Sequence, residues 1–523
     1  MDTKHLIQKY LPEHTEVSIS GNCIIVPVKA ADLVALANGL YRAHRLPLKM
    51  ITALDETRDG GLYRILYVFG IPQAHKFITL SLQTVSEFPS LTPSIHEASL
   101  YERKINSLFG LSPTGHPHPR SIILHDNWPK GTYPLRKKFL WNERPPMTDT
   151  DTPFSFAHIG GEEGIYELPV GPVHAGIIEP GHFRFHLAGE EILNLEPRLG
   201  YSHKGTEKLF ETLPLEKKVQ LSERIAGDSS FTYSLAFCQA VETLMNIVVP
   251  ARAKHLRVVY SELERLANHF SDIGAIMTDT GFNFGGAQGA RLRERVMRIC
   301  DRLTGSRFLR GVNTIGGVTK DLSKEAAHTL SEELVELRTD FAEVMAIAAD
   351  SSSLINRLKD TGILDPKIAR DHGCTGVAGR AVGIQNDARA QYPYAAYESL
   401  RFTMAGAQEG DVEARFTVRI EEVYTSIDLI LQALEALPSD SIAKLQPPVL
   451  PKNAFAVSIT EGWRGDMVCL VATDSTGSIS RVDMRDPSLL NWPCVGYAGK
   501  GNVVPDFPLI NKSFSLSYTG GDM

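Results

Sequence analysis

The chain has few cysteines and no long apolar segment, and both absences narrow its class. Its 523 residues include six cysteines, and none of them forms a CxxC pair. Such sparse cysteines do not predict a disulfide framework and are typical of a reducing cytoplasm. No run reaches the 18 or so apolar residues of a membrane span, and the N-terminus MDTKHLIQKYLPEHTEV has no apolar secretion core. We therefore expect any membrane role to come through partner subunits.

Clustered positive charge and the common nucleotide and hydrolase motifs are also missing. Lys and Arg total 54 against 61 Asp and Glu, and no basic block occurs, which argues against nucleic-acid binding. The chain lacks GxGxxG, GxxxxGK[ST], HExxH and GxSxG. Its nearest glycine-rich segment, GFNFGGAQGAR at 281–291, lacks a phosphate-loop lysine and is predicted to be a loop between helices.

Short apolar runs and helical patterns together predict an α+β fold. CIIVPV (23–28) and LYRILYVFG (62–70) are rich in β-branched and aromatic residues and are typical of strands. The tail from about residue 450 returns to such runs, whereas 320–360 and 412–437 have helical patterns. We expect a small α+β domain over residues 1–140, a Pro-, Asp- and Thr-rich linker over 141–160, and a large α-rich core with flanking β-structure over 161–523.

The clearest helix is predicted over residues 255–274. An apolar face recurs at steps of three and four, through Leu256, Val259, Leu263, Leu266, Phe270 and Ile273. A second, polar stripe has the same spacing and consists of Glu262, Arg265, His269 and Asp272. This stripe has two interpretations, a solvated face or a polar stripe buried against a partner.

Two long patterns resemble known subunits. YERKINSLFGLSPTGHPHPRSIIL (101–124), followed by WPKGTYPLRKKF (128–139), resembles the 30 kDa subunit of respiratory complex I, with Asn106 where that family usually has Asp. GPVHAGIIEPGHFRFHLAGEEILNLEPRLGYSHKGTEKL (171–209) resembles the complex I 49 kDa subunit and the large subunit of energy-converting [NiFe] hydrogenases. The second resemblance continues through 257–269, 305–321 and 373–389.

The resemblance to hydrogenases implies a metal site that this chain has lost. In those proteins two CxxC pairs hold nickel and iron, because soft thiolates suit that centre. Here the corresponding segments are ERIAGDSSFTYSLA (223–236) and PDFPLINKSFSLSYTG (505–520). The four ligand positions become Ala226, Ser229, Ser517 and Gly520. We therefore expect no NiFe centre, no other metal and no cofactor bound by the chain itself.

The resemblance to complex I implies a quinone site, and that signature is also broken. The first histidine of the family's GPxHPxxHG loop matches His174, while the second has no clear counterpart, although His182 lies nearby. The position of the family's quinone-binding tyrosine aligns roughly with Glu223. A bound quinone stays open as a possibility, and both histidines are either surface hydrogen-bonding residues or proton-transfer groups.

The region where related hydrogenases hold their metal centre is predicted to be a small polar pocket in this chain. Arg224, Asp228 and Tyr233 are expected to lie there with the tail, and Asp228 is expected to pair with Arg224 or Lys512 because buried charges need partners. The pocket has two interpretations. It is either a polar network whose groups satisfy one another, or a functional site that binds a quinone-like or other small redox ligand or relays protons. Three further residues match family positions. Arg380 and Asp387 are expected either to form a structural ion pair or to act in the cleft. Glu207 is expected either to cap a helix or to face an Fe–S subunit.

The resemblance as a whole implies a large subunit in the peripheral arm of a complex I-like, hydrogenase-related oxidoreductase. It implies an Fe–S partner subunit with a [4Fe–4S] cluster, antiporter-like membrane subunits that move ions, and a place on the cytoplasmic face of the membrane. Two alternatives remain: a non-catalytic structural or coupling subunit, and a quinone-reducing, NADH dehydrogenase-like subunit.

Overall fold

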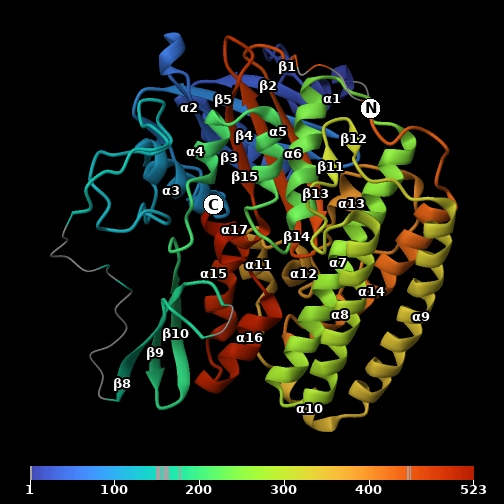
Figure 1. Ribbon diagram of the computed structural model, residues 1–523. Helices are drawn as coiled ribbons and strands as arrows, with labels where there is room; N and C mark the ends of the chain where they lie inside the picture. Colours follow the sequence, from blue (N-terminus) through green and yellow to red (C-terminus); the bar gives the residue numbers. More distant parts are fainter. Residues whose placement is uncertain are drawn as a thin grey trace.

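A mixed sheet flanked by helices forms the N-terminal part of the protein (Figure 1). The computed structural model describes residues 3–148, 154, 156, 164–175, 178–444, 447 and 449–523. The sheet has the order β1-β2-β5-β4-β3, and only β2 and β5 run parallel. Its strands are β1 (Ser18–Ser20), β2 (Cys23–Val28), β3 (Leu48–Asp55), β4 (Tyr63–Ile71) and β5 (Lys76–Thr84). The helices are α1 (Thr3–Tyr10), α2 (Ala30–Asn38) and α3 (Ala98–Phe109), and β6 (Glu87–Pro89) pairs with β7 (Ser112–Thr114).

Long helices form the centre of the rest of the chain, and α7, α8 and α14 pack side by side (Figure 1). The longest are α6 (Ser230–Leu244), α7 (Ala251–Asp279), α8 (Asn283–Thr304), α9 (Lys324–Ala349) and α14 (Val412–Glu435). Shorter ones are α4 (Thr206–Thr212), α5 (Leu215–Ser222), α10 (Ser352–Leu358), α11 (Pro366–Asp371), α12 (Gly376–Arg380) and α13 (Ala388–Gln391). The predicted helices over 255–274, 320–360 and 412–437 are confirmed.

Three small sheets and a C-terminal helical segment surround these helices. The antiparallel sheets are β8 (Ile165–Val170), β9 (His182–Ala188) and β10 (Glu191–Arg198); β11 (Asn313–Thr314) and β12 (Gly317–Val318); and β13 (Phe455–Gly462), β14 (Gly465–Thr473) and β15 (Ile479–Arg485). The chain then forms α15 (Pro487–Gly499), α16 (Phe507–Phe514) and α17 (Tyr518–Asp522). The α+β fold, with an α-rich core and flanking strands, is therefore confirmed.

An apolar layer joins the N-terminal sheet to the C-terminal sheet. Met50, Val68 and Phe77 from the first sheet are buried against Val457 and Leu470 from β13 and β14.

The predicted linker, 141–160, falls largely outside the described residues, since only 141–148, 154 and 156 of it are described. No helix among the described residues is long and apolar enough to cross a membrane.

The structure corrects the prediction for the segment that begins α8 and decides between the two interpretations of the polar stripe on α7. The glycine-rich segment 281–291 is not a loop, because α8 already starts at Asn283. Its glycines let the helices approach closely: a Cβ on Gly289 would lie 2.6 Å from Gly274 Cα on α7. The polar stripe of α7 is not solvated either, because Glu262, Arg265, His269 and Asp272 are all at most 6% exposed.

Candidate functional site

The four positions that align with hydrogenase metal ligands lie at one junction of the fold. Ala226 and Ser229 are in the turn before α6, whereas Ser517 and Gly520 are at the start of α17. The hydroxyl of Thr519 donates a 3.0 Å hydrogen bond to the carbonyl of Ile225. The structure thus joins the two segments that the sequence predicts to meet.

Both serine hydroxyls at this junction already have partners inside the protein. Ser229 Oγ accepts a 3.0 Å hydrogen bond from the indole N–H of Trp463. Ser517 Oγ accepts a 2.9 Å bond from the amide of Gly520 and so caps α17. Alanine and glycine offer no ligand atom, so these residues do not fit a NiFe centre, which needs thiolates. Among the described residues, no group of three or more His, Cys, Asp or Glu side chains could hold a metal ion.

Position 520 has no room for a larger side chain. A Cβ on Gly520 would lie 2.8 Å from Asp486 Cγ and 2.9 Å from the hydroxyl of Tyr233. Those two groups bind each other, since Tyr233 donates a 2.6 Å hydrogen bond to Asp486 Oδ2. Burial raises the pKa of Tyr233 well above its usual range, so its hydroxyl keeps the proton that it donates. Tyr233 was predicted at the site and Asp486 was missed, although an Asp-Pro pair before a helix is a capping signal.

The partner of Asp228 differs from both sequence candidates. Its carboxylate binds Arg464 through two hydrogen bonds of 2.8 Å. Burial alone would raise the pKa of Asp228, but the Arg464 guanidinium holds it below its ordinary value. Arg224 is exposed and Lys512 lies near Asp279. The predicted pairing of Asp228 with Arg224 or Lys512 is therefore wrong, because the turn between β13 and β14 brings Arg464 closer.

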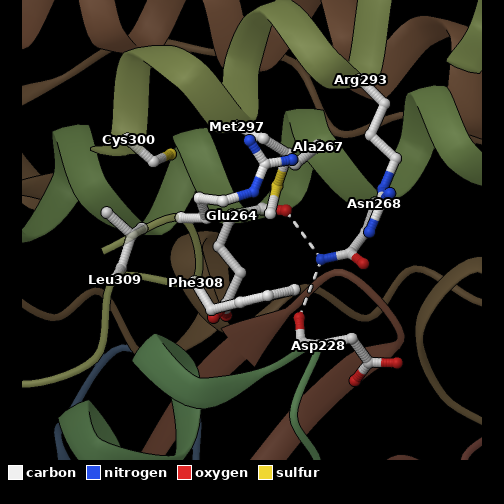
Figure 2. A pocket seen from close by; sticks show the side chains of 10 residues that line it. Asp228, Glu264, Ala267, Asn268, Arg293, Met297, Cys300, Phe308 and Leu309 are labelled. Atoms are coloured by element: carbon white, nitrogen blue, oxygen red, sulfur yellow. Dashed lines mark hydrogen bonds between the residues drawn. The ribbon is translucent and has the colours of Figure 1, made fainter. Parts of the chain in front are cut away.

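A small pocket opens beside Asp228, between α7, α8 and the loop after α8 (Figure 2). It encloses about 20 Å³, which is room for roughly one water molecule. Asn268 spans it, since its amide donates 2.8 and 2.9 Å bonds to the carbonyls of Asp228 and Glu264. Other lining residues are Ala267, Arg293, Met297, Cys300, Arg307, Phe308 and Leu309.

Glu264 is the buried acid of this pocket. Its carboxylate accepts bonds from the amides of Phe231 and Thr232, at 2.7 and 3.1 Å, and from the Thr232 hydroxyl. Burial raises the pKa of Glu264 to about 7, although these hydrogen bonds lower it. Glu264 was missed from the sequence because it adjoins the polar stripe of α7 without belonging to it.

The raised pKa of Glu264 predicts a measurable pH dependence of stability. Between its ordinary value of 4.5 and about 7, the folded protein holds a proton that the unfolded chain releases. The free energy of unfolding therefore falls as pH rises through this window. We expect Glu264→Gln to flatten the dependence between pH 5 and 7, measured as urea unfolding midpoints at each pH. Parallel curves for both proteins would contradict the assignment.

A buried charge network lies beside the site, between α7, α12, α14 and β13. The carboxylate of Glu422 binds His269 Nε2 at 2.7 Å and Arg380 Nη2 at 2.5 Å. Arg380 also donates a 2.9 Å bond to Glu461. Burial alone would raise the pKa of Glu422, but Arg380 and His269 hold it well below its ordinary value. Further members are Glu262, Arg265, Asp272, Asp387, Arg389 and Arg419.

Comparison with known proteins relates this arrangement to two groups of enzymes. Residues 26–145 match the respiratory-chain NADH dehydrogenase 30 kDa subunit, and residues 279–455 match the 49 kDa subunit. Formate hydrogenlyase subunit 5 of Escherichia coli (strain K12) is 34% identical, over 95% of this chain and 89% of its own length. The chain belongs to the family of complex I and hydrogenase large subunits.

Other members of this family are similar along most of their length. Hydrogenase-4 component G of Escherichia coli (strain K12) is 33% identical over 95% of this chain and 88% of its own length. NADH-quinone oxidoreductase subunit 4 of Thermus thermophilus is 32% identical over 67% of this chain and 92% of its own length. The resemblance identified from the sequence motifs is thereby confirmed.

The two loop histidines of this family member lie apart from the Asp228 pocket. His174 Nε2 is 2.7 Å from the carbonyl of Gly181. His182 begins β9, is buried, and lies 5.1 Å from the ring of Phe156. Burial lowers the pKa of His182, so it is neutral at pH 7. Neither histidine lines the pocket, so the structure does not bring them together with Asp228.

The remaining predicted residues have partners that the sequence does not reveal. Arg380 and Asp387 lie 3.9 Å apart, but Asp387 binds Arg389 more closely, at 2.7 Å. Glu207 is buried and pairs with Lys104 of α3 at 3.0 Å and with Arg481 of β15 at 2.8 Å. Glu207 is therefore neither a helix cap nor exposed to a partner. It links the N-terminal part to the core.

Proposed function

We propose that the chain is the large subunit of a complex I-like, membrane-bound oxidoreductase that is related to energy-converting hydrogenases and works without a NiFe centre. In this role an Fe–S subunit with a [4Fe–4S] cluster delivers electrons at the cleft. Antiporter-like membrane subunits couple that transfer to ion movement, and the chain lies at the cytoplasmic face of the membrane. Its division into residues 1–140, 141–160 and 161–523 follows the two subunit types fused in it.

The observation that carries this proposal is the chemistry of the four former ligand positions. Ala226 and Gly520 have no donor atom, and the hydroxyls of Ser229 and Ser517 are engaged by Trp463 and by the α17 backbone. No step through nickel can be built on these residues. The relationship to formate hydrogenlyase subunit 5 and to NADH-quinone oxidoreductase subunit 4 supports a redox complex nonetheless.

A second candidate function is that of a coupling subunit without its own reaction. It is favoured by two side-chain pairs that are already satisfied within the chain, Asp228 with Arg464 and Tyr233 with Asp486. The pocket on the α7–α8 side of Asp228 holds about one water, which is too little for a quinone ring. A quinone-reducing, NADH dehydrogenase-like role would need a larger space, formed together with another subunit.

Purification of the intact complex through a tag on this chain tests the proposal. We expect an Fe–S subunit and membrane subunits to co-purify, with the electron paramagnetic resonance signal of a reduced [4Fe–4S] cluster. Recovery of the chain alone, or hydrogen production from reduced viologen, would contradict the proposal. Reduction of a short-chain quinone by the complex would favour the redox role, whereas an intact but inactive complex would favour the coupling role.

A further inference from the structure

Three arginines near the Asp228 pocket form no ion pair with the residues that the structure describes. Among the described residues, no carboxylate lies within 4.0 Å of the guanidinium groups of Arg224, Arg293 or Arg310. Other arginines of the same region are paired, as Arg307 is with Glu294 at 2.6 Å. Burial raises the pKa of Glu223, whereas the charges of Arg224 and Arg310 lower it. Because the described residues form no ion pair with the three arginines, these side chains place positive charge at this region of a chain whose net charge is −7.

These arginines flank the turn that holds Asp228. The guanidinium of Arg310 lies next to Gly227, where a Cβ would be 3.2 Å from its Nη2. Arg224 is in the same turn and is exposed. Figure 2 shows Arg293 reaching from α8 to the side of Asn268, above the turn that holds Asp228. The Nε of Arg293 is buried without a hydrogen-bond partner in the described part of the chain.

An exposed aromatic ring lies among the arginines. Phe308 lines the pocket, is 39% exposed, and lies 5.5 Å from the guanidinium of Arg310. Aromatic and arginine side chains are the residue types that contribute most to protein–protein binding. The pocket behind the ring holds about one water, so a small-molecule ligand does not fit there.

The loop that presents Phe308 and Arg310 is held in an unusual conformation. Leu309, between them, is buried and has a φ of 55°, which is rare for a side chain without a local polar partner. The amide of Arg310 donates to Ser306 Oγ at 3.0 Å, and the amide of Gly311 to Glu223 Oε1 at 2.6 Å. Burying Leu309 turns its two neighbours outward, and such backbone strain is typical of functional loops. The surface is therefore preorganised for binding.

We propose that Arg224, Arg293, Phe308 and Arg310 form a docking surface for an acidic segment of a neighbouring protein subunit. This inference rests on the proposed function, since it assumes that the chain works inside a complex. Carboxylates of the partner would bind the three guanidinium groups, and an apolar side chain of the same segment would cover Phe308. Glutamate side chains in place of these arginines would repel such an acidic segment.

Charge reversal in the tagged complex tests the surface. We expect the double variant Arg224→Glu/Arg310→Glu to lower the yield of the bound subunit by at least about tenfold at physiological salt. The control is Arg401→Glu, an exposed arginine of another region whose backbone is hydrogen bonded to Gln432. An unchanged thermal unfolding midpoint would show that both variants fold. Unchanged subunit stoichiometry in the double variant would overturn the docking surface but leave the proposed function intact. Wild-type chain recovered alone would overturn both.

The segment that covers Phe308 can be identified directly. The photoreactive analogue p-benzoylphenylalanine replaces Phe308, whose exposed ring leaves space for the added benzoyl group, and the assembled complex is then irradiated. We expect a cross-link to a peptide of another subunit that contains Asp or Glu. A cross-link to lipid, to a second copy of this chain, or to a peptide without acidic residues would overturn the proposal, as would no cross-link at all.

Discussion

Replacing Glu422 with alanine is expected to lower the free energy of unfolding by about 3–5 kcal/mol. Its two oxygens bind His269 and Arg380 at 2.7 and 2.5 Å, and all three side chains are at most 1% exposed. Removal of this acid leaves the Arg380 cation with one carboxylate fewer in an interior that water does not reach. The loss is large because an uncompensated buried charge is far costlier than a broken surface pair.

Urea unfolding followed by circular dichroism checks this effect. Glu422→Gln keeps the shape but removes the charge, so its loss should be smaller and should remain measurable if the alanine variant fails to fold. The control is Glu294→Ala, which breaks the exposed pairs with Arg298 and Arg307 and should barely change the unfolding midpoint. Equal effects at Glu422 and Glu294 would contradict a buried network at this place.

Gly376→Ala is expected to destabilise the protein by about 2–5 kcal/mol, through a clash and a strained backbone together. Gly376 has a φ of 67°, and a Cβ there would lie 1.8 Å from the carbonyl oxygen of Arg464. The new methyl group must push away the turn between β13 and β14. That turn carries Trp463 and Arg464, which bind Ser229 and Asp228, so the substitution also disturbs the candidate site.

A glycine in an ordinary helical conformation provides the control for Gly376. Gly39 has a φ of −57°, and nothing lies within 4 Å of a Cβ built there. Gly39→Ala should therefore leave stability unchanged or raise it by about 0.4–1 kcal/mol. The same urea unfolding measurement applies to both variants. A Gly376→Ala protein as stable as the wild type would show that the turn at Arg464 is not packed as described.

Local patterns predicted the elements of the fold well, but not which faces meet. The spacing of Leu256, Val259 and Leu263 predicted the helix now seen as α7, and all three side chains are fully buried. The charged stripe beside them looks like a solvated face in isolation. It is buried because α14, about 150 residues further along, supplies the opposite charges. The glycines of 281–291 predicted a loop because nothing local shows that two helices need to approach there.

The sequence predicted that two distant segments meet, but not the hydrogen-bond and ion-pair partners of their side chains. The positions Ala226, Ser229, Ser517 and Gly520 were found from the resemblance to hydrogenases, and the structure brings their segments together. Asp228 was assigned to Arg224 or Lys512 because no motif marks Arg464, which lies in the turn between β13 and β14. Glu264 and Asp486 were missed because their roles depend on which elements pack against them.

The central claim is that this family member works without nickel, and metal analysis of the purified intact complex tests it most directly. Inductively coupled plasma mass spectrometry would give the nickel and iron content, with hydrogen uptake assayed on the same sample. The account predicts iron in amounts typical of Fe–S clusters, no stoichiometric nickel and no hydrogen uptake. One nickel per complex together with hydrogen uptake would contradict it.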